Sequence, residues 1–91
     1  MTFSVSLTGR VQGVGCRYYC AQVARRMNVH GSASNMRDGS VEVILTVSER
    51  SEAESYAKAL KENSFGFNFH GRIDSVSVSE HTGSTAGDYT F

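Results

Sequence analysis

The sequence contains no proline, no tryptophan and only two cysteines, and it carries no net charge, because nine basic side chains balance nine acidic ones. Cys16 and Cys20 cannot form the disulfide framework of a small secreted domain, so we expect free thiols in a reducing compartment. No apolar run is long enough to span a membrane, and the first residues do not resemble a signal peptide. We therefore expect a cytoplasmic protein that binds neither membranes nor, given its neutral charge, nucleic acids.

The length bounds the architecture. A chain of 91 residues supports one domain over residues 1–91 with a small core. The hydrophobic fraction of 40% is too high for a disordered chain. No long apolar surface pattern is present, which favours a monomer.

The charges are unevenly distributed along the chain. Residues 1–37 contain five arginines and no carboxylate, whereas residues 38–91 contain all nine carboxylates and only four basic side chains. This asymmetry can mark an anion site in the first half. Alternatively, folding brings the two halves together and the charges cancel.

Hydrophobic periodicity predicts the secondary structure. Alternation of apolar and polar residues predicts strands over residues 3–8, 31–36, 40–47 and 73–78, with a short edge strand in 87–91. Apolar residues at helical spacing predict two helices, with stripes formed by Cys20, Val23, Ala24 and Met27 and by Ala53, Tyr56, Ala57 and Leu60.

Local signals refine these elements. Asp38-Gly39 predicts the tight turn of a hairpin between residues 31–36 and 40–47. Ser51 and Glu54 form a capping-box pattern for the second helix, and Glu54 and Lys58 are spaced to pair along it. A break in alternation at Asp74 predicts a β-bulge.

The resulting order is βαββαβ followed by a short terminal strand. Right-handed crossovers then predict an α+β, ferredoxin-like sandwich, in which two helices cover one face of an antiparallel sheet. Many functions share this fold, so function has to be inferred from particular residues.

The segment from Gly9 to Arg17 has the composition of an anion-binding loop. Gly13 and Gly15 can adopt positive φ, which lets successive N–H groups turn toward one point. The start of the following helix adds unpaired N–H groups, and Arg17 adds a guanidinium. We expect no carboxylate nearby to repel the ligand. The predicted phosphate-binding residues are Gln12, Gly13, Val14, Gly15, Cys16 and Arg17.

The spacing of this loop differs from that of the common phosphate-binding motifs. It lacks the lysine of a Walker A sequence and the third glycine of a dinucleotide-binding fingerprint. From spacing alone, a simple glycine-rich turn remains an alternative.

The segment Gly9-Arg10-Val11-Gln12-Gly13-Val14-Gly15-Cys16-Arg17-Tyr18 resembles the signature of the acylphosphatase family, Gly-x-Val-Gln-Gly-Val-Gly-Phe-Arg. A second family element, Gly-x-Val-x-Asn followed by a turn and an apolar strand, is similar to Gly31-Ser32-Ala33-Ser34-Asn35 and the residues after it. The resemblance covers nearly the whole chain. It implies a small cytosolic enzyme with a ferredoxin-like fold that hydrolyses acyl phosphates, in which Arg17 binds the phosphate and Asn35 orients the attacking water.

The chain departs from the family pattern at four places. Cys16 replaces a phenylalanine, Ser32 stands where an aromatic residue is common, Ala33 replaces valine, and residues 63–70 lack a Gly-Pro element. None of these changes removes Arg17 or Asn35, so they bear on catalytic efficiency more than on the type of reaction.

The implied chemistry needs few groups. A carboxylate leaving group has a conjugate acid with a pKa of about 4 and leaves without a proton, and a loose phosphoryl transition state is stabilised mainly by positioning and electrostatics. We expect no cofactor and no metal, since His30, His70, His81 and the two cysteines lack paired zinc-ligand spacing. The expected ligands are a small acyl phosphate and inorganic phosphate or sulfate. The alternatives are a non-catalytic module that binds phosphate or acyl phosphate, and an RNA-binding domain, for which the strand over 40–47 lacks aromatic residues.

Overall fold

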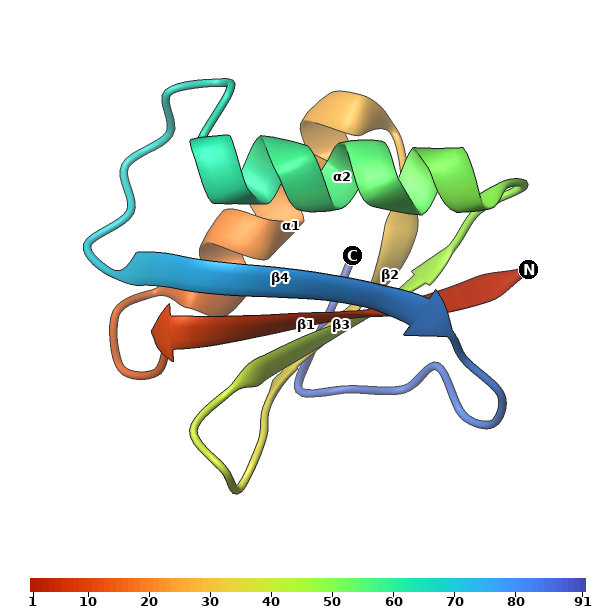
Figure 1. Ribbon diagram of the computed structural model, residues 1–91, viewed down its shortest axis with the longest axis horizontal. Coiled ribbons are helices and arrows are strands. Elements are labelled where there is room, and N and C mark those ends of the chain that lie inside the picture. The colour runs from red at the N-terminus through yellow and green to blue at the C-terminus, as the bar shows by residue number, and fades with distance from the viewer.

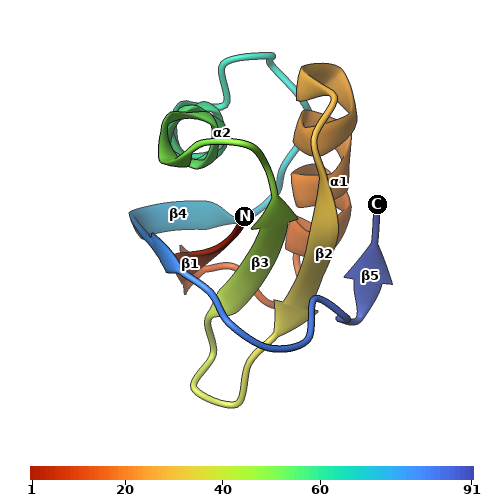
Figure 2. The same ribbon diagram turned by 90° about the vertical axis from the view of Figure 1, so that its right-hand side faces the viewer.

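The computed structural model describes residues 1–91 and contains five strands and two helices (Figure 1). Their order is β1 (Thr2–Arg10), α1 (Cys16–Met27), β2 (His30–Asn35), β3 (Val41–Thr46), α2 (Arg50–Glu62), β4 (Arg72–Glu80) and β5 (Tyr89–Thr90). The strands form one antiparallel sheet in the order β4-β1-β3-β2-β5. Both helices cover the same face of this sheet (Figure 2), which confirms the predicted ferredoxin-like sandwich. No helix has the length and apolar character that crossing a bilayer requires.

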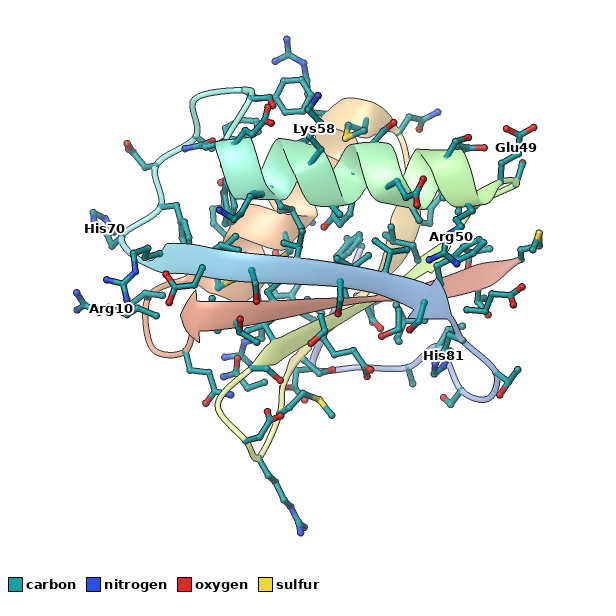
Figure 3. All side chains as sticks on the ribbon, in the orientation of Figure 1. Arg10, Glu49, Arg50, Lys58, His70 and His81 are labelled. Atoms are coloured by element: carbon teal, nitrogen blue, oxygen red, sulfur yellow. The ribbon has the colours of Figure 1, made fainter.

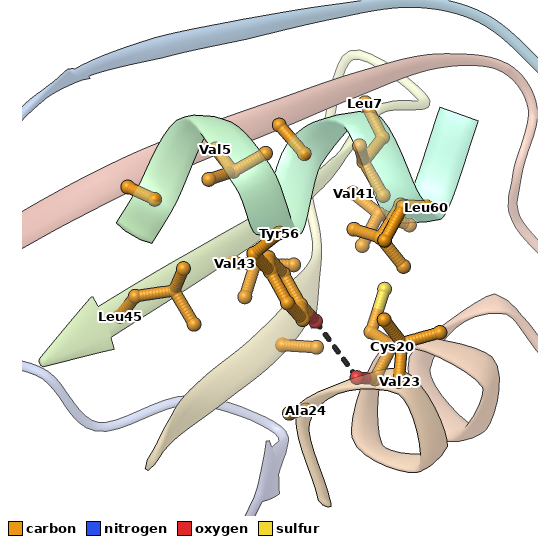
Figure 4. Close-up of a cluster of buried hydrophobic side chains, with 14 of the residues drawn as sticks. Val5, Leu7, Cys20, Val23, Ala24, Val41, Val43, Leu45, Tyr56 and Leu60 are labelled. Atoms are coloured by element: carbon orange, nitrogen blue, oxygen red, sulfur yellow. Dashed lines mark hydrogen bonds between the residues drawn. The ribbon is translucent and has the colours of Figure 1, made fainter. Parts of the chain in front are cut away.

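The core lies between the sheet and the helices and follows the alternation of the central strands. Phe3, Val5 and Leu7 of β1 are fully buried and lie opposite Leu45, Val43 and Val41 of β3 in the antiparallel register. Figure 4 shows several of these side chains beneath α2, together with Cys20 and Val23 of α1. Each such buried aliphatic side chain contributes about 1.5–3 kcal/mol to folding.

β1 extends further than the alternation predicted. It continues through Gly9 to Arg10, and the register with β4 shifts between Thr8 and Gly9, so that Asp74 has no partner on β1. The bulge predicted at Asp74 is therefore confirmed. Gly9 has φ 130°, and a Cβ atom there would lie 2.3 Å from the carbonyl oxygen of Arg72, so only glycine fits. The longer strand delivers the chain directly to the predicted anion-binding loop.

The helix ends follow the predictions only in part. α1 ends at Met27, and Asn28 follows it as the C-cap in the left-handed conformation that commonly ends a helix. α2 begins at Arg50, so Ser51 lies inside the first turn and cannot act as the N-cap. The predicted capping box is therefore wrong, and Ser51 Oγ donates instead to the carboxylate of Glu49. Glu54 pairs with Arg50 at 3.3 Å rather than with Lys58.

Candidate active site

Residues 11–15 connect β1 to α1 and form a turn that depends on two glycines. Gly13 has φ 72° and Gly15 has φ 79°, which confirms the positive φ values expected at both positions. Gly15 is the N-cap of α1, and no side chain caps the helix at this end. The first turn of α1 also contains no acidic residue. Its N–H groups and the positive end of the helix dipole are therefore available to an anion.

Arg17 and Asn35 come from different elements and line the same cavity, which has a volume of about 260 Å³. Arg17 is the second residue of α1, and Asn35 is the last residue of β2. The cavity is lined by Val11, Gly13, Gly15, Cys16, Arg17, Tyr18, Asn35 and Tyr89. Four of the six residues expected to bind phosphate are therefore part of this surface.

Gln12 and Val14 do not line the cavity. Gln12 Nε2 donates to the carbonyl oxygens of Met36 at 2.7 Å and Ser40 at 2.9 Å. Its side chain thus ties the loop to the turn that follows Asn35. Val14 is partly buried and packs against the hydrophobic core. Both side chains hold the loop in place, a contribution that the motif alone does not reveal.

The turn after Asn35 is held by Asp38. Its Oδ1 accepts hydrogen bonds from the backbone N–H of Ser40 at 3.0 Å and from the Ser40 hydroxyl at 2.6 Å. These bonds hold the pKa of the Asp38 carboxyl below its usual value. The carboxylate therefore stabilises the predicted Asp-Gly turn, in which Gly39 has φ 94°.

A carboxylate lies directly beside the arginine, contrary to the expectation that none would be nearby. Arg17 Nη1 donates to Asp88 Oδ2 at 3.2 Å, and the backbone N–H of Asn35 donates to the same oxygen at 3.0 Å. Asp88 reaches this place because β5 pairs with β2, with Tyr89 opposite Ala33. The sequence predicted a terminal edge strand but not its register, and the register decides which residue faces Arg17.

Comparison with known proteins agrees with this arrangement. The family model for acylphosphatase matches residues 3–90. The chain belongs to the acylphosphatase family. It is 48% identical over 54 residues to an acylphosphatase of Rhodopseudomonas palustris, covering 59% of this chain and 54% of that protein. It is 38% identical over 68 residues to an acylphosphatase of Corynebacterium glutamicum, covering 75% of this chain and 71% of that protein.

The fold is shared with a crystal structure of acylphosphatase from Bacillus subtilis. The TM-score is 0.71 with 27% sequence identity, and the superposition covers 91% of this chain and 87% of the other. The matches to curated acylphosphatases are shorter, and the aligned segment spans about half of the Rhodopseudomonas protein.

The structure shows how two departures from the acylphosphatase signature are accommodated. Cys16 is buried below the loop beside Cys20; both are free thiols, as predicted, and both belong to the core. The hydrogen bond between the two thiols, together with burial, raises the pKa of Cys20. The same hydrogen bond lowers the pKa of Cys16. Ser32 is also buried, and its hydroxyl donates to the carbonyl oxygen of Thr85 at 2.7 Å. The small residue at position 32 thus anchors the C-terminal segment.

Two tyrosines form one wall of the cavity. Tyr18 is 54% exposed, and its ring meets that of Tyr89 edge to face, with the ring centroids 6.5 Å apart. Tyr19 points the other way, is buried and stacks on Phe69 at 4.6 Å. The consecutive tyrosines therefore have different surroundings, one at the mouth of the cavity and one in the core. Nowhere do three or more His, Cys, Asp or Glu side chains gather as a possible metal site.

Proposed function

We propose that this single-domain protein hydrolyses acyl phosphates to a carboxylate and inorganic phosphate without a metal ion. The observation that carries the proposal is the meeting of Arg17 and Asn35 in one cavity beside a loop with two positive-φ glycines. Membership of the acylphosphatase family supports the same reaction.

In this proposal the phosphate group of the substrate lies against the loop and the start of α1. Backbone N–H groups of the loop and the Arg17 guanidinium donate to its oxygens, where charge accumulates in the transition state. Such donors are effective because they are held in place before the reaction and need little reorganisation. The same N–H groups and the guanidinium can also donate to the oxygens of inorganic phosphate or sulfate, which would bind at this place as ligands.

Asn35 orients the attacking water through its side-chain amide. The water oxygen bonds to phosphorus as the bond between phosphorus and the acyl oxygen breaks, and the electron pair leaves with the carboxylate. A phosphate oxygen of the substrate takes the proton from the water, so the protein supplies proximity rather than a base. A carboxylate leaving group with a conjugate-acid pKa of about 4 needs no general acid.

The acyl portion of the substrate extends toward the mouth of the cavity. Tyr18 and Tyr89 are the aromatic residues at this place, and a small cavity with few other contacts favours loose selectivity for the acyl group. We infer that the protein acts as a monomer on small soluble substrates in the cytoplasm.

The proposal is tested by following phosphate release from acetyl phosphate in the presence of a chelator. We expect hydrolysis by the unchanged protein and its loss in Arg17→Ala and in Asn35→Ala. Arg10→Ala and Asn68→Ala are matched controls, since both residues are exposed and Arg10 points away from the fold (Figure 3). Unchanged hydrolysis in both site variants would refute the assignment of the site. Phosphate binding without any turnover would instead indicate a non-catalytic binding module.

A further inference from the structure

The contact between Asp88 and the cavity involves a single oxygen atom. Asp88 Oδ2 accepts one hydrogen bond from Nη1 of Arg17 and one from the backbone N–H of Asn35, at 3.2 and 3.0 Å. One carboxylate oxygen therefore connects the two residues to which the proposed function assigns phosphate binding and water orientation. Neither the signature motif nor the charge pattern of the sequence indicated this connection.

Asp88 is held in place from its own side of the chain. Its backbone N–H donates to Ser34 Oγ at 2.9 Å, and Ser32 Oγ donates to the carbonyl oxygen of Thr85 at 2.7 Å. A Cβ atom on Gly87 would lie 2.7 Å from Ser32 Oγ and 2.9 Å from Ser32 Cβ. The segment before β5 therefore runs tightly over β2, and the small side chains at positions 32 and 87 allow this approach.

We propose that Asp88 is a positioning residue that holds the Arg17 guanidinium and the end of β2 in the geometry needed for phosphate transfer. This inference rests on the proposed function. A guanidinium has five N–H donors, and the bond to Asp88 uses Nη1 alone, so further donors stay free for a phosphate. Both side chains are nearly half exposed, at 42% and 47%, and such ion pairs are weak. The main effect of the contact is therefore on orientation.

The geometry allows orientation to be separated from charge. Because the same oxygen accepts both bonds, the amide oxygen of Asp88→Asn can accept them as well, without the negative charge. Asp88→Ala removes both the charge and the acceptor. The two variants have the same charge, so the difference between them reports the hydrogen bonds alone.

We expect kcat/KM for acetyl phosphate to be at least about tenfold lower in Asp88→Ala than in Asp88→Asn, because misplacing the groups that hold the phosphate and the water slows the reaction more than the weak ion pair itself would suggest. Asp88→Ala should also bind inorganic phosphate more weakly than Asp88→Asn, with a correspondingly larger dissociation constant measured by calorimetry. Equal values in the two variants would overturn the inference. Tighter phosphate binding in both than in the unchanged protein, with no difference between them, would instead show that Asp88 only competes with the ligand.

Two controls test for general effects. Asp74→Ala removes a carboxylate from another exposed ion pair, that with Arg72, and should leave both constants unchanged. Ser32→Ala removes the bond to Thr85 but keeps Asp88. It therefore reports how much loosening of the segment before β5 alone changes kcat/KM and phosphate binding. A loss in Ser32→Ala as large as that in Asp88→Ala would overturn the inference. An unchanged protein that does not hydrolyse acetyl phosphate would refute the proposed function, and the phosphate measurement would still test Asp88.

Discussion

The two helices are joined by a reciprocal pair of buried hydrogen bonds, which makes a quantitative prediction possible. Tyr19 of α1 donates its hydroxyl to the carbonyl oxygen of Leu60 in α2, and Tyr56 of α2 donates to that of Cys20 in α1, both at 2.7 Å (Figure 4 shows the second). Both tyrosines are fully buried. The bonds thus fix α1, which carries Arg17 in its first turn, against its neighbour.

The expected loss of stability follows from what remains after each hydroxyl is removed. The Leu60 carbonyl keeps a bond from the backbone N–H of Asn63 at 3.4 Å, and the Cys20 carbonyl lies inside a helix, where an amide four residues later reaches it. Neither carbonyl is left without a partner. We therefore expect Tyr19→Phe and Tyr56→Phe each to lower the free energy of unfolding by about 1 kcal/mol, the usual net value of one hydrogen bond. For a domain of this size this corresponds to a melting temperature lower by roughly 4–8 °C.

The pH dependence provides a second measure of the same contacts. Burial raises the pKa of Tyr19 to about 12 and that of Tyr56 well above its usual value. Unfolded tyrosines lose their protons near pH 10, so above this pH the unfolded chain binds fewer protons than the folded protein. Stability is then complete below pH 10 and falls as pH rises toward 12, by about 1.4 kcal/mol per pH unit for each tyrosine that stays protonated.

Urea denaturation at pH 7 and at several values between pH 10 and 12 tests both statements. Tyr56→Phe should be less stable than the unchanged protein at pH 7 and should lose less stability as the pH rises. Equal urea midpoints at pH 7, or equal slopes above pH 10, would refute the reasoning. Because neither hydroxyl lines the cavity, hydrolysis by the folded variant should be unchanged.

Three further predictions concern the cavity. Arg17→Ala should weaken inhibition by inorganic phosphate by about tenfold or more, the effect of losing a bond to a charged group, whereas Asn35→Ala should keep this inhibition constant and lower kcat; the opposite pattern would exchange the two roles. Gly15→Ala should lower the free energy of unfolding by about 1–2 kcal/mol, because its φ of 79° strains any other residue although no atom lies within 4 Å of the added Cβ, and an unchanged urea midpoint would contradict this. Tyr18→Ala should reduce the ratio of kcat/KM for benzoyl phosphate to that for acetyl phosphate by roughly twofold to tenfold, as expected for one aromatic contact; an unchanged ratio would place the acyl group elsewhere.

Features that depend on neighbouring residues were predictable from the sequence. The alternation of Phe3, Val5 and Leu7 follows from the two faces of a strand, and the bulge at Asp74 follows from a break in that alternation. The positive φ at Gly13 and Gly15 follows from the need to turn a strand into a helix within a few residues. Each of these features has a local cause, so a local pattern reveals it.

Features that depend on distant pairing were not predictable in the same way. The capping-box pattern at Ser51 and Glu54 is present, but Arg50 begins the helix and takes Glu54 as its partner, with a further bond from Arg50 Nη2 to the carbonyl oxygen of Val78 on β4. Gln12 bridges to a turn far along the chain, where two carbonyl oxygens lie within reach. A tertiary contact decides between local options in both cases.

Long-range contacts also determine what becomes of the charge asymmetry between the two halves of the sequence. Of the five arginines in the first 37 residues only Arg17 lines the cavity, while the others are exposed and Arg26 lies 5.0 Å from the ring of Phe65. The acidic second half of the chain supplies Asp88 to that one arginine. The charges of Arg17 and Asp88 thus cancel, and the cavity holds no concentration of positive charge. Under the proposed function, binding of phosphate therefore depends on the N–H groups of the loop as well as on Arg17, so the backbone conformation at Gly15 should matter in addition to the charge of Arg17.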